Sequence, residues 1–90
     1  MGTLSPIARL GDTSDHGGTI ITASTVVSCD GIGVARQGDL HSCPIPGHGV
    51  TPLISGSDGK MADGLLIIRI GDIAECGAVV ITGSPVSSST

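Results

Sequence analysis

The sequence predicts an all-β fold made of three short repeats of one unit. An Arg-x-Gly-Asp run occurs three times along the chain, at Arg9–Asp12, Arg36–Asp39 and Arg69–Asp72. The apolar segments are short, rich in Ile and Val, and interrupted by Gly or Pro, which is typical of strands and turns. No window shows the roughly 3.6-residue apolar period of an amphipathic helix. One unit is too short to bury a core by itself, so three like units must pack together and can face one axis.

We expect six strands of four to six residues, each dominated by β-branched or aliphatic side chains, at 19–22, 25–28, 32–36, 51–55, 65–70 and 79–82. The dipeptides Asp30-Gly31 and Asp63-Gly64 predict tight hairpin turns, because Asp-Gly accepts the positive φ angles of such turns. Asp58-Gly59 is a third turn signal, in a longer connection.

The repeats divide one domain, residues 1–90, into three units of unequal length. We place them at about 5–33, 34–66 and 67–86, followed by a frayed tail at 87–90. The second interval between Arg-x-Gly-Asp runs is longer than the first. Its surplus lies mainly in the loop 43–49 and in the connection 58–63.

Composition indicates a folded chain with a small apolar core. Of the 90 residues, 39% are hydrophobic and 13% are charged, a balance typical of one globular domain. Aromatic residues, which bury the largest area each, are absent from the sequence. A chain of this size then needs a further staple, which could be a metal, a disulfide or a partner surface. Three cysteines are an odd number, which favours free or metal-bound thiols in a reducing cytoplasm.

The charge pattern argues against a nucleic-acid partner. The formal net charge is −4, and three of the four Lys and Arg residues belong to the repeated run, so no basic patch is left for phosphate. Residues 1–6 lack the cationic head and apolar stretch of a signal peptide, and we expect none. The apolar run Leu65–Ile68 is far too short to span a membrane.

Each Arg-x-Gly-Asp run predicts an ion pair at one corner of its unit. The planar guanidinium matches a carboxylate, and the Gly lets the chain bend between them. The sequence offers no nucleophile beside these acids, so we interpret the pairs as structural. The expected pairs are Arg9 with Asp12, Arg36 with Asp39 and Arg69 with Asp72.

Histidine and cysteine residues follow the Gly-Asp corners. His16, Cys43 and Cys76 each stand four residues after an Asp, and His41 and His48 follow the second corner. If the corners meet at one axis, these side chains converge. Three imidazoles and one thiolate form an acceptable tetrahedral zinc set, and four protein ligands leave no open position. Such a zinc would be structural.

Other interpretations of these residues stay open. A loop histidine can be merely solvated, and a buried cysteine behaves as a small apolar side chain. Cys29 lies in an expected strand away from the corners, and we interpret it as core. A small zinc hydrolase would need an open metal position and a general base, for which Asp15 or Glu75 would serve. We favour a protein without enzymatic activity.

As a set, these motifs resemble the PAAR-repeat family, named for a Pro-Ala-Ala-Arg run. The resemblance covers about residues 5–86 and rests on four features. They are the run Pro6–Arg9 with its Gly-Asp, the two further Arg-x-Gly-Asp corners, the step His16–Gly18 and the closing Gly83–Pro85. Only the first repeat keeps the proline of the family run.

The resemblance implies a small conical β-prism with pseudo-threefold symmetry and a metal-stapled apex. Its base would cap a homotrimeric VgrG-like spike protein, one chain per trimer, as the piercing tip of a type VI secretion system. Zinc would be held by His16, His41, His48 and Cys76, with Cys43 as the alternative thiolate. Secreted effectors and, transiently, a target membrane would be further contacts. The chain would assemble in the cytoplasm and then be secreted outside the cell or into a target cell. A tip on a related contractile particle, such as a phage tail spike, is the alternative.

Overall fold

The computed structural model describes residues 5–54, 56, 60–85 and 88–89 of the chain. This part contains short strands and no helix, which confirms the all-β prediction. It also contains no helix with the length and hydropathy of a membrane span. The strands are β1 (Ser5–Pro6), β2 (Thr19–Ile20), β3 (Ser28–Cys29), β4 (Ile32–Gly33), β5 (Leu40–Ser42), β6 (Val50–Pro52), β7 (Met61–Ala62), β8 (Leu65–Leu66) and β9 (Ser88–Ser89).

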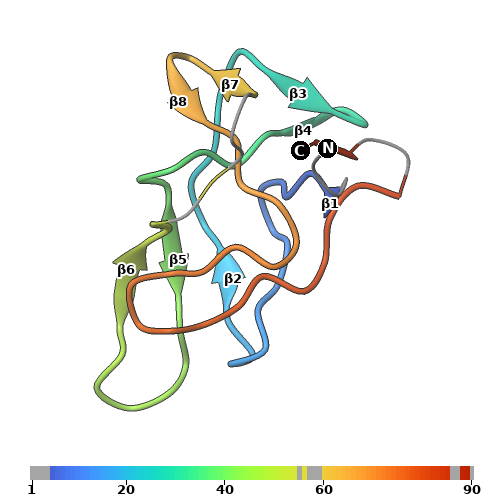
Figure 1. The fold of residues 1–90 in the computed structure, drawn as a ribbon. Coiled ribbons are helices and arrows are strands. Elements are labelled where there is room, and N and C mark those ends of the chain that lie inside the picture. The colour runs from blue at the N-terminus through green and yellow to red at the C-terminus, as the bar shows by residue number, and fades with distance from the viewer. Residues whose placement is uncertain (1–4, 55, 57–59, 86–87, 90) are drawn as a thin grey trace.

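All strand pairs are antiparallel and belong to four small sheets, with the orders β1-β9, β2-β5-β6, β3-β4 and β7-β8. Figure 1 shows the β3–β4 and β7–β8 hairpins at one end of the molecule and the loop between β5 and β6 at the other. Both Asp-Gly turns form as predicted, because Asp30 and Asp63 adopt φ angles of 58° and 54°. The third turn signal, Asp58-Gly59, lies outside the described residues.

Five of the six expected strands overlap an observed strand, which is shorter than expected in each case. Three of them continue as single bridges to another unit, at Val34, Leu53 and Ile67. The strand expected at 79–82 is wrong, because this segment forms only single bridges at Val79 and Val80. β1, β5, β7 and β9 form where no strand was predicted, because their residues carry little β-branched character. β1 pairs with β9 and β5 pairs with β2, which are distant in the sequence, so these strands depend on tertiary contacts. β7 instead pairs with β8 across the local Asp63-Gly64 turn.

The three units close into a ring through backbone hydrogen bonds. Ala8 N–H donates to the Ile68 carbonyl at 2.9 Å, Ala35 N–H to Ala8 at 3.0 Å, and Ile68 N–H to Ala35 at 2.9 Å. The bridges repeat the same order, pairing Arg9 with Val34, Arg36 with Ile67 and Arg69 with Ile7. Each unit therefore donates to one neighbour and accepts from the other, which gives the pseudo-threefold arrangement.

Equivalent residues of the three units stack in layers along this axis. The first two layers are apolar: Ile7, Val34 and Ile67 are at most 8% exposed, and Ala8, Ala35 and Ile68 are fully buried. Ile20, Leu53 and Val80, each 1% exposed, surround the axis above them. The next layer holds Ser14, His41 and Ala74, and the apolar core ends there. Small and polar side chains thus occupy the axis toward the end that carries the β5–β6 loop.

The unit around Arg9 builds its two-stranded sheet from two segments that are far apart in the sequence. The hairpins β3–β4 and β7–β8 stand directly before Arg36 and Arg69. In front of Arg9, the same place is taken by β1 paired with β9, which lie side by side in Figure 1. The strand register is the same in all three units. The residue three positions before each corner Arg is paired in each case: Pro6 with Ser88, Gly33 with Ser28 and Leu66 with Met61. The expected tail at 87–90 therefore contributes a paired strand at Ser88–Ser89.

Candidate metal centre

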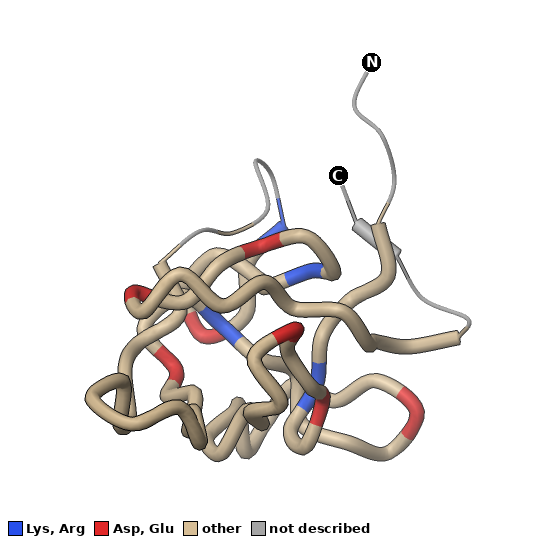
Figure 2. Tube along the Cα trace, turned by 90° about the horizontal axis from the view of Figure 1, so that it is seen from below, with Lys and Arg blue, Asp and Glu red and all other residues tan. Residues whose placement is uncertain are grey.

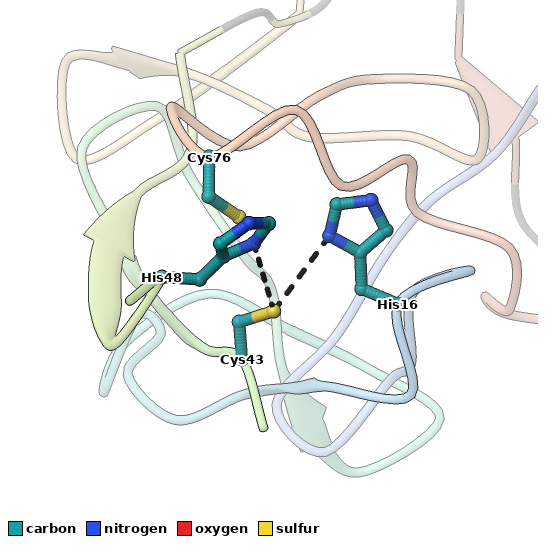
Figure 3. A group of neighbouring side chains, drawn as sticks. All are labelled: His16, Cys43, His48 and Cys76. Atoms are coloured by element: carbon teal, nitrogen blue, oxygen red, sulfur yellow. Dashed lines mark hydrogen bonds between the residues drawn. The ribbon is translucent and has the colours of Figure 1, made fainter. Parts of the chain in front are cut away.

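Four side chains meet at the end of the axis where the apolar core stops. His16, Cys43, His48 and Cys76 each offer one ligand atom, and these atoms all lie within 4.8 Å of one another. Figure 3 shows the Cys43 thiol between the two imidazoles. Its Sγ lies 3.6 Å from His16 Nδ1 and 3.4 Å from His48 Nδ1. Cys43 is buried and the other three are partly exposed.

The repeat geometry brings three of these residues together. His16, Cys43 and Cys76 occupy the same position in their units, four residues after the corner Asp. His16 and Cys76 lie in short turns closed by Gly17 N–H to Ser14 and Gly77 N–H to Ala74. Cys43 directly follows β5. Any atom on the axis is therefore approached by one donor from each unit.

The fourth donor comes from the segment that makes the second unit longer. His48 lies in the loop between β5 and β6. This loop is closed by a hydrogen bond from Cys43 N–H to the Gly49 carbonyl at 2.9 Å. His48 N–H donates to Ile45 at 3.0 Å. Gly47 and Gly49 adopt φ angles of 87° and 61°, which turn the loop back toward the axis at little steric cost.

The donor set suits a tetrahedral zinc ion. Zinc–sulfur bonds of about 2.3 Å and zinc–nitrogen bonds of about 2.0–2.1 Å put tetrahedral donors about 3.3–3.8 Å apart. The two distances from Cys43 fall in this range. Two thiols and two imidazoles are a common structural zinc set, and four protein donors fill the shell.

The local environment favours the thiolate at Cys76. Burial by itself raises the pKa of this thiol. The Ala78 backbone and the neighbouring Thr51 and Cys43 side chains outweigh it and hold the pKa below its ordinary value. A thiol ligand binds metal in the deprotonated form, so this environment prepares Cys76 for coordination.

His41, which the family resemblance implied as a ligand, lies outside this group. It is two residues before Cys43 on the same side of an extended segment, and two residues span about 6.6–6.8 Å along a strand. The two side chains therefore sit in successive layers. His41 is fully buried, and its Nε2 lies 2.8 Å from Ser14 Oγ. The structure brings Cys43 together with Cys76, where the implied set had one or the other.

Gly18 of the first unit packs closely against the fully buried His41. A Cβ atom on Gly18 would lie 2.5 Å from His41 Nε2 and 2.3 Å from the Ser42 carbonyl, so only glycine fits there. Burial lowers the pKa of His41, and the neighbouring His16 lowers it further, against an opposing effect of Asp15. These contacts indicate a neutral imidazole inside the ring.

The corner acids and arginines pair within each run. Arg36 makes three short contacts: its Nε and Nη2 each donate to Asp39 at 2.9 Å, and its Nη1 donates to Asp63 at 2.9 Å. Arg9 contacts Asp12 at 3.3 Å and Asp30 at 3.1 Å. Arg69 contacts Asp72 at 3.2 Å. Figure 2 shows acidic and basic positions interspersed along the chain, in keeping with local pairing.

The buried Asp39 carboxylate predicts a loss of stability in acid. Its burial raises the pKa, but hydrogen bonds from the Arg36 guanidinium, the Thr22 hydroxyl and the Arg36 backbone N–H hold it below 3.8. Because the unfolded state then binds more protons below about pH 3.8, the contribution of Asp39 is complete above this pH and is lost below it. The unfolding free-energy difference between wild type and Asp39→Asn, from urea titrations of the two metal-free proteins, should be constant from pH 5 to 7. It should shrink below pH 3.8. A difference independent of pH would contradict the assignment.

The acids considered as general bases lie at the rim of the metal group. Asp15 is exposed, and its Oδ1 accepts a hydrogen bond from Val79 N–H at 2.9 Å. Glu75 is also exposed, and its backbone N–H donates to the Pro52 carbonyl.

Cys29, expected in the core, is 8% exposed and packs with Ile7, Val34 and their neighbours.

The fold and the site define a small all-β domain of three cyclically paired units with a metal-capable His/Cys group at its apex. Residues 10–82 match the family model described as the PAAR motif, and the chain belongs to this family. The PAAR motif family is associated with structural spike-tip proteins of type VI secretion and implies association with a spike protein. No curated protein matches the chain.

Proposed function

We propose that this chain is the structural, non-enzymatic tip that caps a homotrimeric VgrG-like spike in a type VI secretion system. The observation that carries the proposal is the closed ring of three units. One chain thereby offers three equivalent surfaces around one axis, which is what a threefold partner requires. The association of the PAAR motif family with spike tips supports the same conclusion.

The docking face in this proposal is the end with the hairpins β3–β4 and β7–β8. This end exposes apolar side chains, with Val26 81%, Met61 57% and Leu65 41% exposed. Short open strand edges with apolar residues invite pairing with another chain. A spike trimer would cover them by continuing its own sheets onto the ribbons.

The apex in this proposal is held by zinc on His16, Cys43, His48 and Cys76. When bound, the ion supplies a link among all three units one layer beyond Ser14, His41 and Ala74, where the large apolar side chains of the core have ended. Its binding free energy then contributes directly to folding. The filled tetrahedral set leaves no position for an activated water, so the geometry favours a staple over a hydrolase.

The remaining elements of the proposal follow from this role. The tip assembles on its spike in the cytoplasm and is then delivered outside the cell or into a target cell, together with effectors. It contacts the target membrane only in passing, as the sharpened end of the spike.

The test is the stoichiometry of the complex. The purified chain is mixed with a VgrG-like spike trimer, and the complex is isolated by size exclusion and weighed by native mass spectrometry. One chain and one zinc per spike trimer are expected. A complex with three chains per trimer, or failure of the chain to bind the spike, would overturn the proposal.

A further inference from the structure

Two of the four donors at the apex are thiols, and they lie close together. The ligand atoms of Cys43 and Cys76 are within 4.8 Å of each other. They come from the second and third units of the ring. The third cysteine, Cys29, is buried in a different cluster with Val34, Ala62 and Ile67.

We propose that Cys43 and Cys76 form a disulfide when the metal is absent and a peroxide is present, so that a covalent bond replaces the ion as the link between these units. A disulfide requires the sulfurs to approach to about 2.05 Å. Neither cysteine lies in the middle of a strand, since Cys43 follows β5 and Cys76 lies in the turn between Ala74 and Ala78. Closing the remaining distance requires rotation of both side chains and a shift of the turn that holds Cys76.

The chemistry follows from the exposure of the two thiols. Cys76 is partly exposed and is oxidised first: its sulfur attacks one peroxide oxygen, the O–O bond breaks, and a sulfenic acid and water form. The buried Cys43 then attacks the sulfenic sulfur, the S–S bond forms, and the hydroxyl leaves as a second water. Two electrons pass from the two sulfurs to one hydrogen peroxide molecule, which is reduced to two waters.

Metal and disulfide compete for the same sulfur atoms. A thiolate that ligates zinc is not free to attack peroxide, so the loaded protein should oxidise slowly. This protection by zinc is the one part of the inference that rests on the proposed function. The metal-free protein tests the disulfide and the loaded protein tests the metal site, so the two can fail separately.

The experiment uses the full chain, stripped of metal with a chelator and treated with stoichiometric hydrogen peroxide at low protein concentration. Trypsin cleaves after Arg36, Lys60 and Arg69, so each cysteine falls in a different peptide, with Cys43 in 37–60 and Cys76 in 70–90. The expected product has lost two hydrogens and yields these two peptides linked to each other. Its Tm should exceed that of the reduced metal-free protein by about 10 °C or more.

The three cysteine variants provide matched controls. Cys29→Ser should form the linked peptides as wild type does, whereas Cys43→Ser and Cys76→Ser should not. Links through Cys29, or sulfinic acid without a link, would overturn the inference. Zinc-loaded protein should react at least tenfold more slowly. An equal rate with and without zinc would overturn the protective role of the ion and leave the disulfide standing.

Discussion

Replacing Cys43 with Ser should remove stoichiometric zinc from the protein, whereas replacing His41 with Gln should leave one zinc per chain. Cys43 lies between the two imidazoles, 3.4–3.6 Å from their Nδ1 atoms, whereas His41 is hydrogen-bonded to Ser14 one layer below. If loss of a ligand weakens binding 1,000-fold, the stabilisation lost under saturating conditions is about 4 kcal/mol. The measurements are metal content by mass spectrometry and thermal unfolding with and without a chelator.

Two further variants make the ligand test specific. Cys29→Ser changes a thiol outside the site and should keep both the zinc and its stabilisation. Cys76→Ala should lose both, as Cys43→Ser does. His41→Gln should lower the Tm through its buried layer while the chelator still lowers it further. Zinc retained by Cys43→Ser and lost by His41→Gln would assign the fourth ligand to His41.

Replacing Arg36 with Ala should destabilise the fold by about 2–3 kcal/mol, somewhat less than the loss of one partner from a fully buried ion pair. The guanidinium makes two contacts at 2.9 Å to Asp39, a carboxylate whose side chain is 6% exposed, and a third to Asp63. Its removal leaves Asp39 with the Thr22 hydroxyl and one backbone N–H as partners. Urea unfolding of the zinc-saturated proteins gives the difference.

The first unit supplies the comparison for this variant. Arg9 contacts Asp12 at 3.3 Å through Nε, so Arg9→Ala should cost less than Arg36→Ala. Arg36→Lys keeps the charge and loses the planar fork, and its cost should fall between wild type and alanine. Equal stability of Arg36→Ala and wild type would mean that the pair contributes nothing to folding.

The sequence predicted much of the site because the site obeys the repeat. The position four residues after each corner Asp holds His16, Cys43 or Cys76, and a threefold arrangement alone makes these residues converge. The family resemblance implied His41 in place of Cys43. A strand rise of about 3.3–3.4 Å per residue puts His41 one layer away, which spacing in the sequence could have indicated.

The length and pairing of the strands could be predicted only in part. The Asp-Gly turns were correct because their chemistry is local. Strands such as β5 and β9 depend on edges that other units supply, and no residue preference within Leu40–Ser42 or Ser88–Ser89 reports such an edge. The family resemblance implied His48 as a ligand, but its approach to the axis depends on the turns at Gly47 and Gly49.

Closure of the three units into a ring has a consequence for how the protein opens. A linear array of repeats can fray from either end, whereas this ring has no terminal repeat from which unfolding could begin. The amides of Ala8, Ala35 and Ile68 each donate a hydrogen bond to a different unit, so breaking one of these bonds opens the ring that all three hold closed. Native-state hydrogen exchange should therefore report one common opening free energy at these three amides, equal to that of global unfolding.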